Sequence, residues 1–300
     1  MNTTFVTAMY GHGFTSTHGG RGRHIHFYNS SLRNINNLNI PLVIYTDPEQ
    51  VAVTEQFISP YMKKYRIVPQ ALEEFEFAKQ VLEYKEKTLA DRTLNDRNHI
   101  LCYNKPYWVK DSIEKNYFNT EKFLWIDSGL THHGIFPEKV GGVELYTNPL
   151  EEVYYPTNTN NVFNPTLGAN LDKILQPDKL FGCALPLQGG DDQLKQIIKS
   201  SLDVNIPHVS DHIIGGMFGG YSQKFLEFFN IYRTILKYCI EQNILILEEP
   251  IFSCVNAVYP DMFDIHKFTT WWFYSPGERT HMLGEEGDSF YKVFKKIHDL

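Results

Sequence analysis

A single aspartate, Asp127, ends a short apolar run in this chain. Residues 123–126 precede it, and Ser128 and Gly129 follow it. A carboxylate at the carboxyl end of a buried strand lies where open α/β sheets bind ligands and metals. Aspartate followed by Ser-Gly is also ordinary turn chemistry, which would simply end the strand. Asp127 is therefore either a ligand-binding carboxylate or a turn residue.

A glycine-rich segment, residues 215–220, lies in the second half of the chain. Its two glycine pairs let the backbone approach a ligand closely, although a pair of bulged turns would account for them as well. Just upstream, Asp211 and His212 can bind a hydroxylated ligand or a metal. A hydrogen-bonded core histidine is the alternative for His212.

Two adjacent carboxylates, Glu248 and Glu249, begin a predicted short helix that ends before Pro260. The helix dipole favours acidic residues at this position, so capping is one explanation. Next to the apolar run 244–247, one of them can also serve in a pocket as a general base or nucleophile. Four histidines are further metal candidates, although no two have the spacing of ligands on one helix face: His132, His133, His266 and His281.

A second glycine-rich segment, residues 11–23, follows the first predicted strand, where a phosphate can rest on backbone amides. It departs from the dinucleotide fingerprint because Ser16 stands in the place of the third glycine, and Asp47 lies beyond the expected distance. In spite of these departures, an oxidoreductase that binds a dinucleotide at this loop is an alternative function. Arg21 and Arg23 can meet phosphates or can be solvated surface cations.

These residues need alternating strands and helices to bring them together. Apolar runs predict strands at residues 5–9, 42–45, 123–126 and 180–184. Periodicity and capping predict helices at residues 23–32, 73–87, 104–116 and 191–201, and from 222 and 248 onward. Asn104 is the expected cap of one helix, with Pro106 in its first turn, and Ser222 caps another. Residues 141–179, rich in Asn, Thr and Pro, are predicted to form a long loop-rich excursion.

Bulk composition limits the classes of protein. The 300 residues suffice for one α/β domain spanning residues 1–300. A net charge of −7 argues against nucleic acid as a partner. The N-terminus does not resemble a signal peptide, and no run approaches the length of a transmembrane segment. The cysteines are far apart, which indicates reduced and mostly buried thiols: Cys102, Cys183, Cys239 and Cys254. We expect a cytoplasmic protein whose only membrane contact would be peripheral, at the inner face of the cytoplasmic membrane.

Six short segments together resemble the WlaTC/HtrL family of bacterial glycosyltransferase-like proteins. They occur in one order over most of the chain: residues 3–9, 41–47, 104–108, 125–129, 215–220 and 248–249. The family looks like the GT-A class of glycosyltransferases. The resemblance implies an α/β fold, a single Rossmann-like domain with a mostly parallel mixed central sheet flanked by helices. It also implies transfer of a sugar from a nucleotide-sugar donor to a hydroxyl of a glycan or glycolipid acceptor, such as a lipooligosaccharide, lipopolysaccharide or capsule precursor.

The resemblance also implies site residues. The donor would be bound by residues on several elements: Thr7, Ala8, Tyr10, Asp47, Lys105, Trp108, Asp127, Ser128, Gly129, Gly215 and Gly216. Asp127 would take the place of the Asp-x-Asp element that holds Mn²⁺ or Mg²⁺ on the donor diphosphate, with His281 as a further metal ligand. Because residues 127–129 contain only one carboxylate, Lys105, Arg21 or Arg23 can supply the positive charge instead.

Glu249 is the expected catalytic carboxylate, with Glu248 as the alternative and Asp211 as a residue that holds sugar hydroxyls. Breaking the bond between a sugar and a diphosphate places negative charge on the leaving group, which a divalent metal or placed cations must stabilise. A non-catalytic glycan-binding protein with a decayed donor site is the third hypothesis, because the single carboxylate at Asp127 also fits it.

Overall fold

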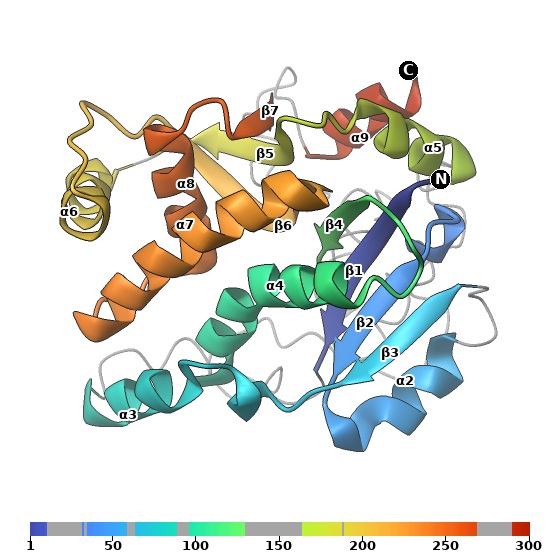
Figure 1. The fold of residues 1–300 in the computed structure, drawn as a ribbon, viewed down its shortest axis with the longest axis horizontal. Coiled ribbons are helices and arrows are strands. Elements are labelled where there is room, and N and C mark those ends of the chain that lie inside the picture. Colours follow the sequence, from blue (N-terminus) through green and yellow to red (C-terminus); the bar gives the residue numbers. More distant parts are fainter. Residues whose placement is uncertain are drawn as a thin grey trace, which may run out of the picture.

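The computed structural model describes residues 1–10, 32, 35–58, 64–88, 96–129, 164–187, 189–268 and 290–300. Within these residues, one sheet of seven strands runs through the molecule in the order β3-β2-β1-β4-β6-β5-β7 (Figure 1). Its strands are β1 (Thr3–Met9), β2 (Leu42–Thr46), β3 (Tyr65–Pro69), β4 (Lys122–Ile126), β5 (Leu180–Pro186), β6 (Asp211–Tyr221) and β7 (Phe263–Lys267).

The sheet is mixed and mostly parallel, as predicted. β1 is parallel to β2 and β4, β2 is parallel to β3, and β5 is parallel to β7. β6 runs antiparallel to both of its neighbours, β4 and β5. β6 therefore joins two parallel groups of strands that come from different halves of the chain.

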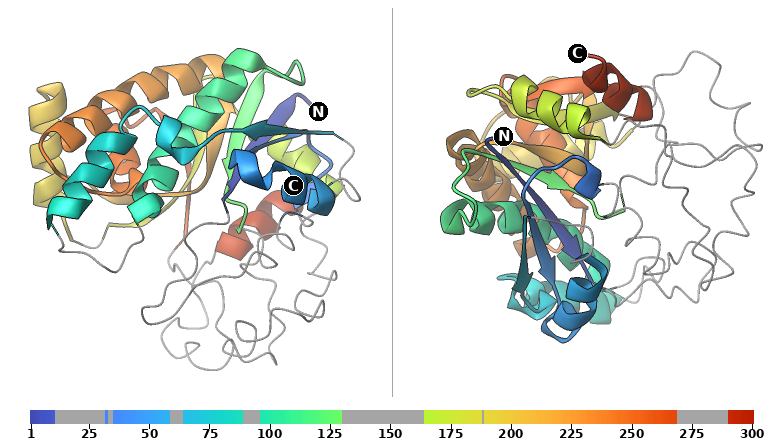
Figure 2. Two further views of the ribbon diagram at one scale, coloured as in Figure 1. Left: turned by 90° about the horizontal axis from the view of Figure 1, so that it is seen from below. Right: turned by 90° about the vertical axis from the view of Figure 1, so that its right-hand side faces the viewer.

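Helices cover both faces of the sheet (Figure 2). The helices are α2 (Val51–Ile58), α3 (Ala78–Thr88), α4 (Asp96–Lys115), α5 (Pro165–Ile174), α6 (Asp191–Leu202), α7 (Ser222–Glu241), α8 (Glu248–Val258) and α9 (Phe290–His298), with 3-10 turns η1 (Pro48–Gln50) and η2 (Leu72–Glu74). Buried side chains of α3, α4, α6, α7 and α8 share one core cluster, and those of α2, α5 and α9 share the other. An α/β fold flanked by helices is thus confirmed.

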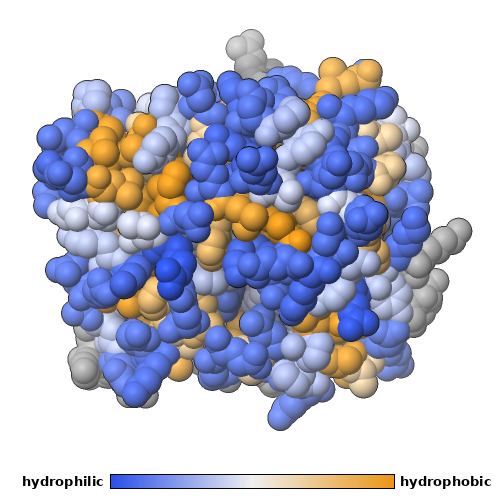
Figure 3. Space-filling view, viewed as in Figure 1, coloured by the Kyte–Doolittle hydropathy of each residue, from blue (hydrophilic) through white to orange (hydrophobic). Residues whose placement is uncertain are grey.

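Alternation along the strands explains the two cores. Phe123 and Trp125 of β4 belong to the core under α4, whereas Leu124 and Ile126 belong to the opposite core. Successive side chains of a strand point to opposite faces, so a strand covered on both faces is apolar throughout. The outer surface over α4 and α7 is mostly hydrophilic and is crossed by a hydrophobic strip (Figure 3). No helix among the described residues has the length and hydropathy that a membrane span requires.

Most predicted elements are present. The strands predicted at 5–9, 42–45, 123–126 and 180–184 correspond to β1, β2, β4 and β5, and the helix predicted at 191–201 corresponds to α6. The helix predicted from Glu248 is α8. The helix predicted at 23–32 and the glycine-rich segment 11–23 lie outside the described residues, apart from Leu32. The prediction of one domain over residues 1–300 remains a prediction.

The predicted start of α4 is wrong. The helix begins at Asp96, so Asn104 and Pro106 lie inside it. Pro106 has no N–H to donate to the carbonyl four residues earlier, which normally disfavours such a position. Tyr103 and Trp108, on either side of it, are buried in the core, and their packing outweighs the local preference.

Three other boundaries differ from the predictions. α3 begins at Ala78 rather than at residue 73, because residues 72–74 form η2 and Phe75 is extended. Tyr221 is the N-cap of α7, and Ser222 is its first helical residue. The predicted loop-rich excursion 141–179 contains α5, which Asn164 caps by accepting hydrogen bonds from two backbone N–H groups. Residues 141–163 of that excursion lie outside the described part of the chain.

The glycine-rich segment 215–220 belongs to one continuous strand, β6, and not to a pair of turns. Its pairing with β4 is regular, but its register against β5 shifts between Gly182 and Ala184. This β-bulge releases backbone groups of Gly215 from the ladder with β5. Gly219, with a φ of 146°, comes so close to β4 that a Cβ there would lie 2.1 Å from the Phe123 carbonyl oxygen.

Candidate functional site

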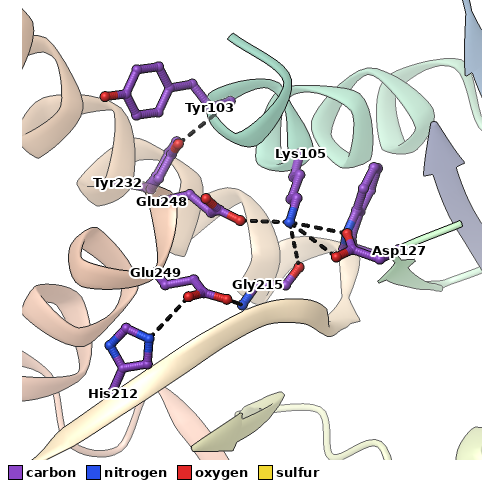
Figure 4. A network of polar contacts seen from close by, with 9 residues as sticks. Tyr103, Lys105, Asp127, His212, Gly215, Tyr232, Glu248 and Glu249 are labelled. Atoms are coloured by element: carbon purple, nitrogen blue, oxygen red, sulfur yellow. Dashed lines mark hydrogen bonds and ion pairs between the residues drawn. The ribbon is translucent and has the colours of Figure 1, made fainter. Parts of the chain in front are cut away.

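Four charged side chains meet at the carboxyl end of β4, and we call them the Lys105 cluster: Lys105, Asp127, Glu248 and Glu249 (Figure 4). Lys105 comes from α4, Asp127 follows β4, and the two glutamates are the first residues of α8. Three elements that are distant in sequence therefore converge on the end of a parallel strand, where open sheets bind ligands.

Lys105 is at the centre of this cluster. Its Nζ lies 2.6 Å from Glu248 Oε1, 3.1 Å from Asp127 Oδ1 and 3.2 Å from the carbonyl oxygen of Gly215. An ammonium group has three N–H donors, so these contacts use all of them. Burial alone would lower the pKa of Lys105, but Asp127 and Glu248 outweigh it and hold the pKa well above its ordinary value.

The backbone of Gly215 serves both sides of the cluster. Its carbonyl oxygen accepts from Lys105, and its N–H donates to Glu249 Oε1 at 2.8 Å. The bulge in β6 makes these two groups available. A Cβ on Gly215 would lie 2.3 Å from Glu248 Oε1, so the absence of a side chain here makes room for the Glu248 carboxylate.

Asp127 is held on both its backbone and its side chain. Its N–H donates to the Gly216 carbonyl oxygen at 2.8 Å, and its Oδ1 accepts from Trp125 Nε1 at 2.7 Å. Burial raises the pKa of Asp127, Lys105 opposes that shift, and Glu248 adds to it. The side chain is 37% exposed, which makes it the most accessible member of the cluster.

The two glutamates have different surroundings. The Glu248 side chain is 2% exposed and is bound to Lys105, whereas that of Glu249 is 18% exposed. Glu249 Oε2 lies 3.0 Å from His212 Nε2, and Oε1 accepts from Gly215. Ser253 joins this region to β6 by donating to the Glu249 carbonyl and accepting from the Ile213 N–H. Of the two, only Glu249 is accessible enough to contact a ligand.

Most of the other predicted site residues make their contacts outside the cluster. Asp211, at the start of β6, pairs with Lys267 at 2.8 Å. Asp47 caps η1 by accepting from the Glu49 N–H. Thr7 is buried on the sheet face that carries Phe5 and Met9, opposite the face of Trp125. Ala8 is half-buried. Ser128, the residue that follows Asp127, is buried. Arg21, Arg23, His132, His133 and His281 lie outside the described residues.

Two predicted donor-binding rings belong to a stack in the core. Trp108 stacks on Tyr10 with ring centroids 5.4 Å apart and on Trp125 with centroids 5.7 Å apart. Gln70 accepts from Trp108 Nε1 through its side chain and from the Tyr10 hydroxyl through its carbonyl. The stack positions α4 over β1 and β4, and thereby positions Lys105. The predicted donor contacts of Tyr10 and Trp108 remain predictions.

Two supporting residues were not predicted, although the sequence contains a signal for each. Trp125 stands two positions before Asp127, so both side chains lie on the same face of the strand. Ser253 stands four positions after Glu249 on the same face of a helix.

A divalent metal at this site would require carboxylate oxygens that converge on an open position. Lys105 Nζ holds the position between Asp127 and Glu248. Elsewhere among the described residues, no three His, Cys, Asp or Glu side chains come together as metal ligands. The donor set in the described part of the chain therefore does not fit a divalent metal.

Comparisons with known proteins bear on the family. The family model HtrL_YibB, described as a bacterial protein of unknown function, matches residues 50–153, a range that contains Lys105 and Asp127. This match confirms the resemblance to the HtrL family that the sequence motifs indicate. A search of curated proteins found no match.

Two solved structures resemble the chain over most of its length. One is the 4-diphosphocytidyl-2C-methyl-D-erythritol synthase of Anaerococcus prevotii, which is 10% identical with a TM-score of 0.42, over 93% of this chain and 94% of that chain. The other is mouse xyloside xylosyltransferase 1 in its apo form, which is 8% identical with a TM-score of 0.42, over 99% of this chain and 94% of that chain. At such scores neither likeness carries an argument about function.

Proposed function

We propose that this protein, whose residues 50–153 match the HtrL_YibB family, is a glycosyltransferase of the GT-A class. It would move a sugar from a nucleotide-sugar donor to a hydroxyl of a glycan acceptor. The observation that supports this proposal is the Lys105 cluster itself. A partly exposed carboxylate, Glu249, and an ammonium, Lys105, bind the N–H and the carbonyl of the same glycine of β6, beside the carboxyl end of β4.

The cluster offers the two groups that sugar transfer needs. The acceptor oxygen forms a bond to the anomeric carbon while the bond from that carbon to the diphosphate oxygen breaks. The bonding electrons leave with the diphosphate, and Glu249 takes the proton of the acceptor hydroxyl in an inverting transfer. Hydrogen bonds from the Gly215 N–H and from His212 would hold the Glu249 carboxylate in place during this step.

Lys105 would stabilise the charge on the leaving group. Its three donors are occupied, so a phosphate oxygen must replace one of its partners. Of its two carboxylate partners, Asp127 is the one to be replaced, because its side chain is more exposed and its contact is longer than that of Glu248. Asp211 and the predicted residues of β1 would contact other parts of the donor. A lipooligosaccharide, lipopolysaccharide or capsule precursor as acceptor, and a cytoplasmic site of action, belong to the same proposal.

Calorimetry with a panel of nucleotide sugars, with and without Mn²⁺, tests the donor site. We expect at least one donor to bind the wild-type protein. A Glu249→Gln variant should bind that donor equally well but transfer its sugar about 10²–10⁴-fold more slowly, because it lacks the base. Glu227→Gln is the matched control, since Glu227 is an exposed glutamate on α7 that pairs with Lys224.

The outcomes separate the three hypotheses. Failure of every nucleotide sugar to bind would falsify the proposal. Binding of a nicotinamide dinucleotide, abolished by substitution of Gly11 or Gly13, would identify an oxidoreductase. A non-catalytic glycan-binding protein would retain its activity in cells after Asp127→Ala and Glu249→Ala.

A further inference from the structure

The contacts of Lys105 bear on whether a divalent metal has a place at the site beside this lysine. We infer that the Lys105 ammonium is the resident cation and occupies the position that a divalent metal would take between Asp127 and Glu248. The role of this cation toward a donor rests on the proposed function. Its occupancy of the site does not, and it can be measured without any donor.

The oxygen atoms around Lys105 Nζ are of the kind that hard metal ions prefer. They are Glu248 Oε1, the Asp127 carboxylate and the carbonyl oxygen of Gly215, at 2.6, 3.1 and 3.2 Å. Carboxylates and backbone carbonyls are the usual ligands of Mg²⁺ and Ca²⁺. The contacts with Asp127 and Gly215, at 3.1 and 3.2 Å, suit N–H···O bonds and exceed the ligand distances of either ion, and the 2.6 Å contact with Glu248 exceeds those of Mg²⁺. The ligand shell is therefore arranged around an ammonium.

The ammonium is also enclosed. The side chain of Lys105 is 12% exposed, and that of its shortest contact, Glu248, is 2% exposed. A metal can enter only if Lys105 leaves, and Lys105 would then lose three hydrogen-bonding partners at once. Gly215 reinforces the arrangement, because its missing side chain is what admits the Glu248 carboxylate to this position.

Net charge gives a second reason for a built-in cation. The cluster contains three carboxylates, and in the part of the chain that the structure describes the Lys105 ammonium contacts two of them, Asp127 and Glu248. Without it, Asp127 and Glu248 would present two unneutralised charges around one partly buried position, which is costly in a medium of low polarity. Removal of the lysine should therefore convert an ammonium site into a metal-binding site.

Electron paramagnetic resonance of free Mn²⁺ tests this inference directly. Wild-type protein should leave the Mn²⁺ signal unchanged. Lys105→Ala should lower the free Mn²⁺ signal at Mn²⁺ concentrations about tenfold below the highest at which wild type shows no binding, and Asp127→Asn in the same chain should abolish this gain. Lys122→Ala is the matched control, because Lys122 is 10% exposed but has one carboxylate partner, Asp172, at 3.5 Å. It should gain no Mn²⁺ binding.

Each result decides the matter. Binding of Mn²⁺ to wild type that Asp127→Asn removes would overturn the inference, as would a folded Lys105→Ala protein that binds no Mn²⁺. Because loss of the lysine can prevent folding, Lys105→Gln is a second variant, and circular dichroism reports the fold of both. If neither folds, the wild-type measurement decides alone. Failure of all nucleotide sugars to bind would remove the proposed function and leave this result standing.

Discussion

The Asp127 carboxylate combines partial exposure with a pKa above its ordinary value. Burial is the main cause of the raised pKa, and the neighbouring Glu248 adds to it against the pull of Lys105. A carboxyl group whose pKa is raised by folding holds its proton more tightly in the folded state than in the unfolded state. The folded protein is therefore destabilised as pH rises from the ordinary value through the raised one, and it remains so at neutral pH.

Replacement of Asp127 by asparagine should consequently stabilise the protein at neutral pH. We expect Asp127→Asn to unfold at a higher temperature than wild type at pH 7, with a difference that disappears below about pH 4, the ordinary pKa of aspartate. Thermal unfolding followed by circular dichroism at several pH values measures this. Asp203→Asn is the contrasting variant, because a hydrogen bond from Lys199 lowers the pKa of Asp203. Removal of the Asp203 charge should therefore not stabilise the folded protein. A less stable Asp127→Asn at pH 7 would show that the Lys105 ion pair outweighs the cost of burial.

Among the elements, the junction of α8 with β6 decides where Glu249 lies. Ser253 is 1% exposed and accepts the Ile213 N–H at 3.0 Å while its own hydroxyl donates to the Glu249 carbonyl at 2.9 Å. Without the hydroxyl, a buried N–H of β6 has no acceptor, and an unsatisfied buried group costs more than a lost surface hydrogen bond.

Ser253→Ala should therefore lower the free energy of unfolding by about 1–3 kcal/mol. Ser201→Ala is the matched control, because the Ser201 hydroxyl also donates to the carbonyl four residues earlier but, within the described residues, accepts no hydrogen bond from a backbone N–H. Urea unfolding should show a shifted midpoint for Ser253→Ala at an unchanged slope. Equal effects of the two substitutions would mean that the link to β6 contributes nothing.

Sequence patterns predict elements better than they predict the packing between them. The runs that became β1, β2, β4 and β5 are apolar because both faces of the sheet are covered, and such runs are visible in the sequence. The start of α4 is not visible in the sequence. Residues 104–106 favour a helix cap and a first turn, but the burial of Tyr103 and Trp108 stabilises a helix that continues through them.

The site shows the same division. Asp127, Glu248 and Glu249 can each be named from the sequence, because a strand end and a helix start place carboxylates there. That Lys105 contacts two of these carboxylates depends on how α4 lies across β4, which the stack of Trp108 on Trp125 determines. It also depends on the bulge between β5 and β6. Both are contacts between residues far apart in the chain, and a local pattern carries no information about them.

At the scale of the whole molecule, the reactivity of the four cysteine thiols measures how far solvent and reagents can enter the two cores. Cys183, Cys239 and Cys254 are buried, and Cys102 is half-buried beside the Lys105 cluster. Burial raises the pKa of the Cys239 and Cys254 thiols to about 12, and those of Cys102 and Cys183 are raised as well. The thiolate is the reactive form, so the native thiols should be inert near neutral pH.

A thiol-reactive dye such as Ellman's reagent checks this. At pH 8 we expect the native protein to react slowly, and the protein unfolded in guanidinium to release colour for all four cysteines at once. Addition of a reducing agent should leave the count in the unfolded protein unchanged, because the four cysteines are free. Rapid reaction of one native thiol would reveal an opening of the core near that residue.

The place of β6 between two parallel groups of strands also has a consequence for biosynthesis. Lys122 of β4 pairs with Tyr221, and Ile126 pairs with Met217, so β4 obtains its second neighbour only after most of the chain has been made. Until then, a nascent chain that has already formed β1, β2, β3 and β4 displays a hydrogen-bonding edge of apolar residues to the ribosome surface and the cell. Translation speed between β4 and β6, and shielding of that edge by a chaperone, should thus govern how much of the protein is obtained in soluble form.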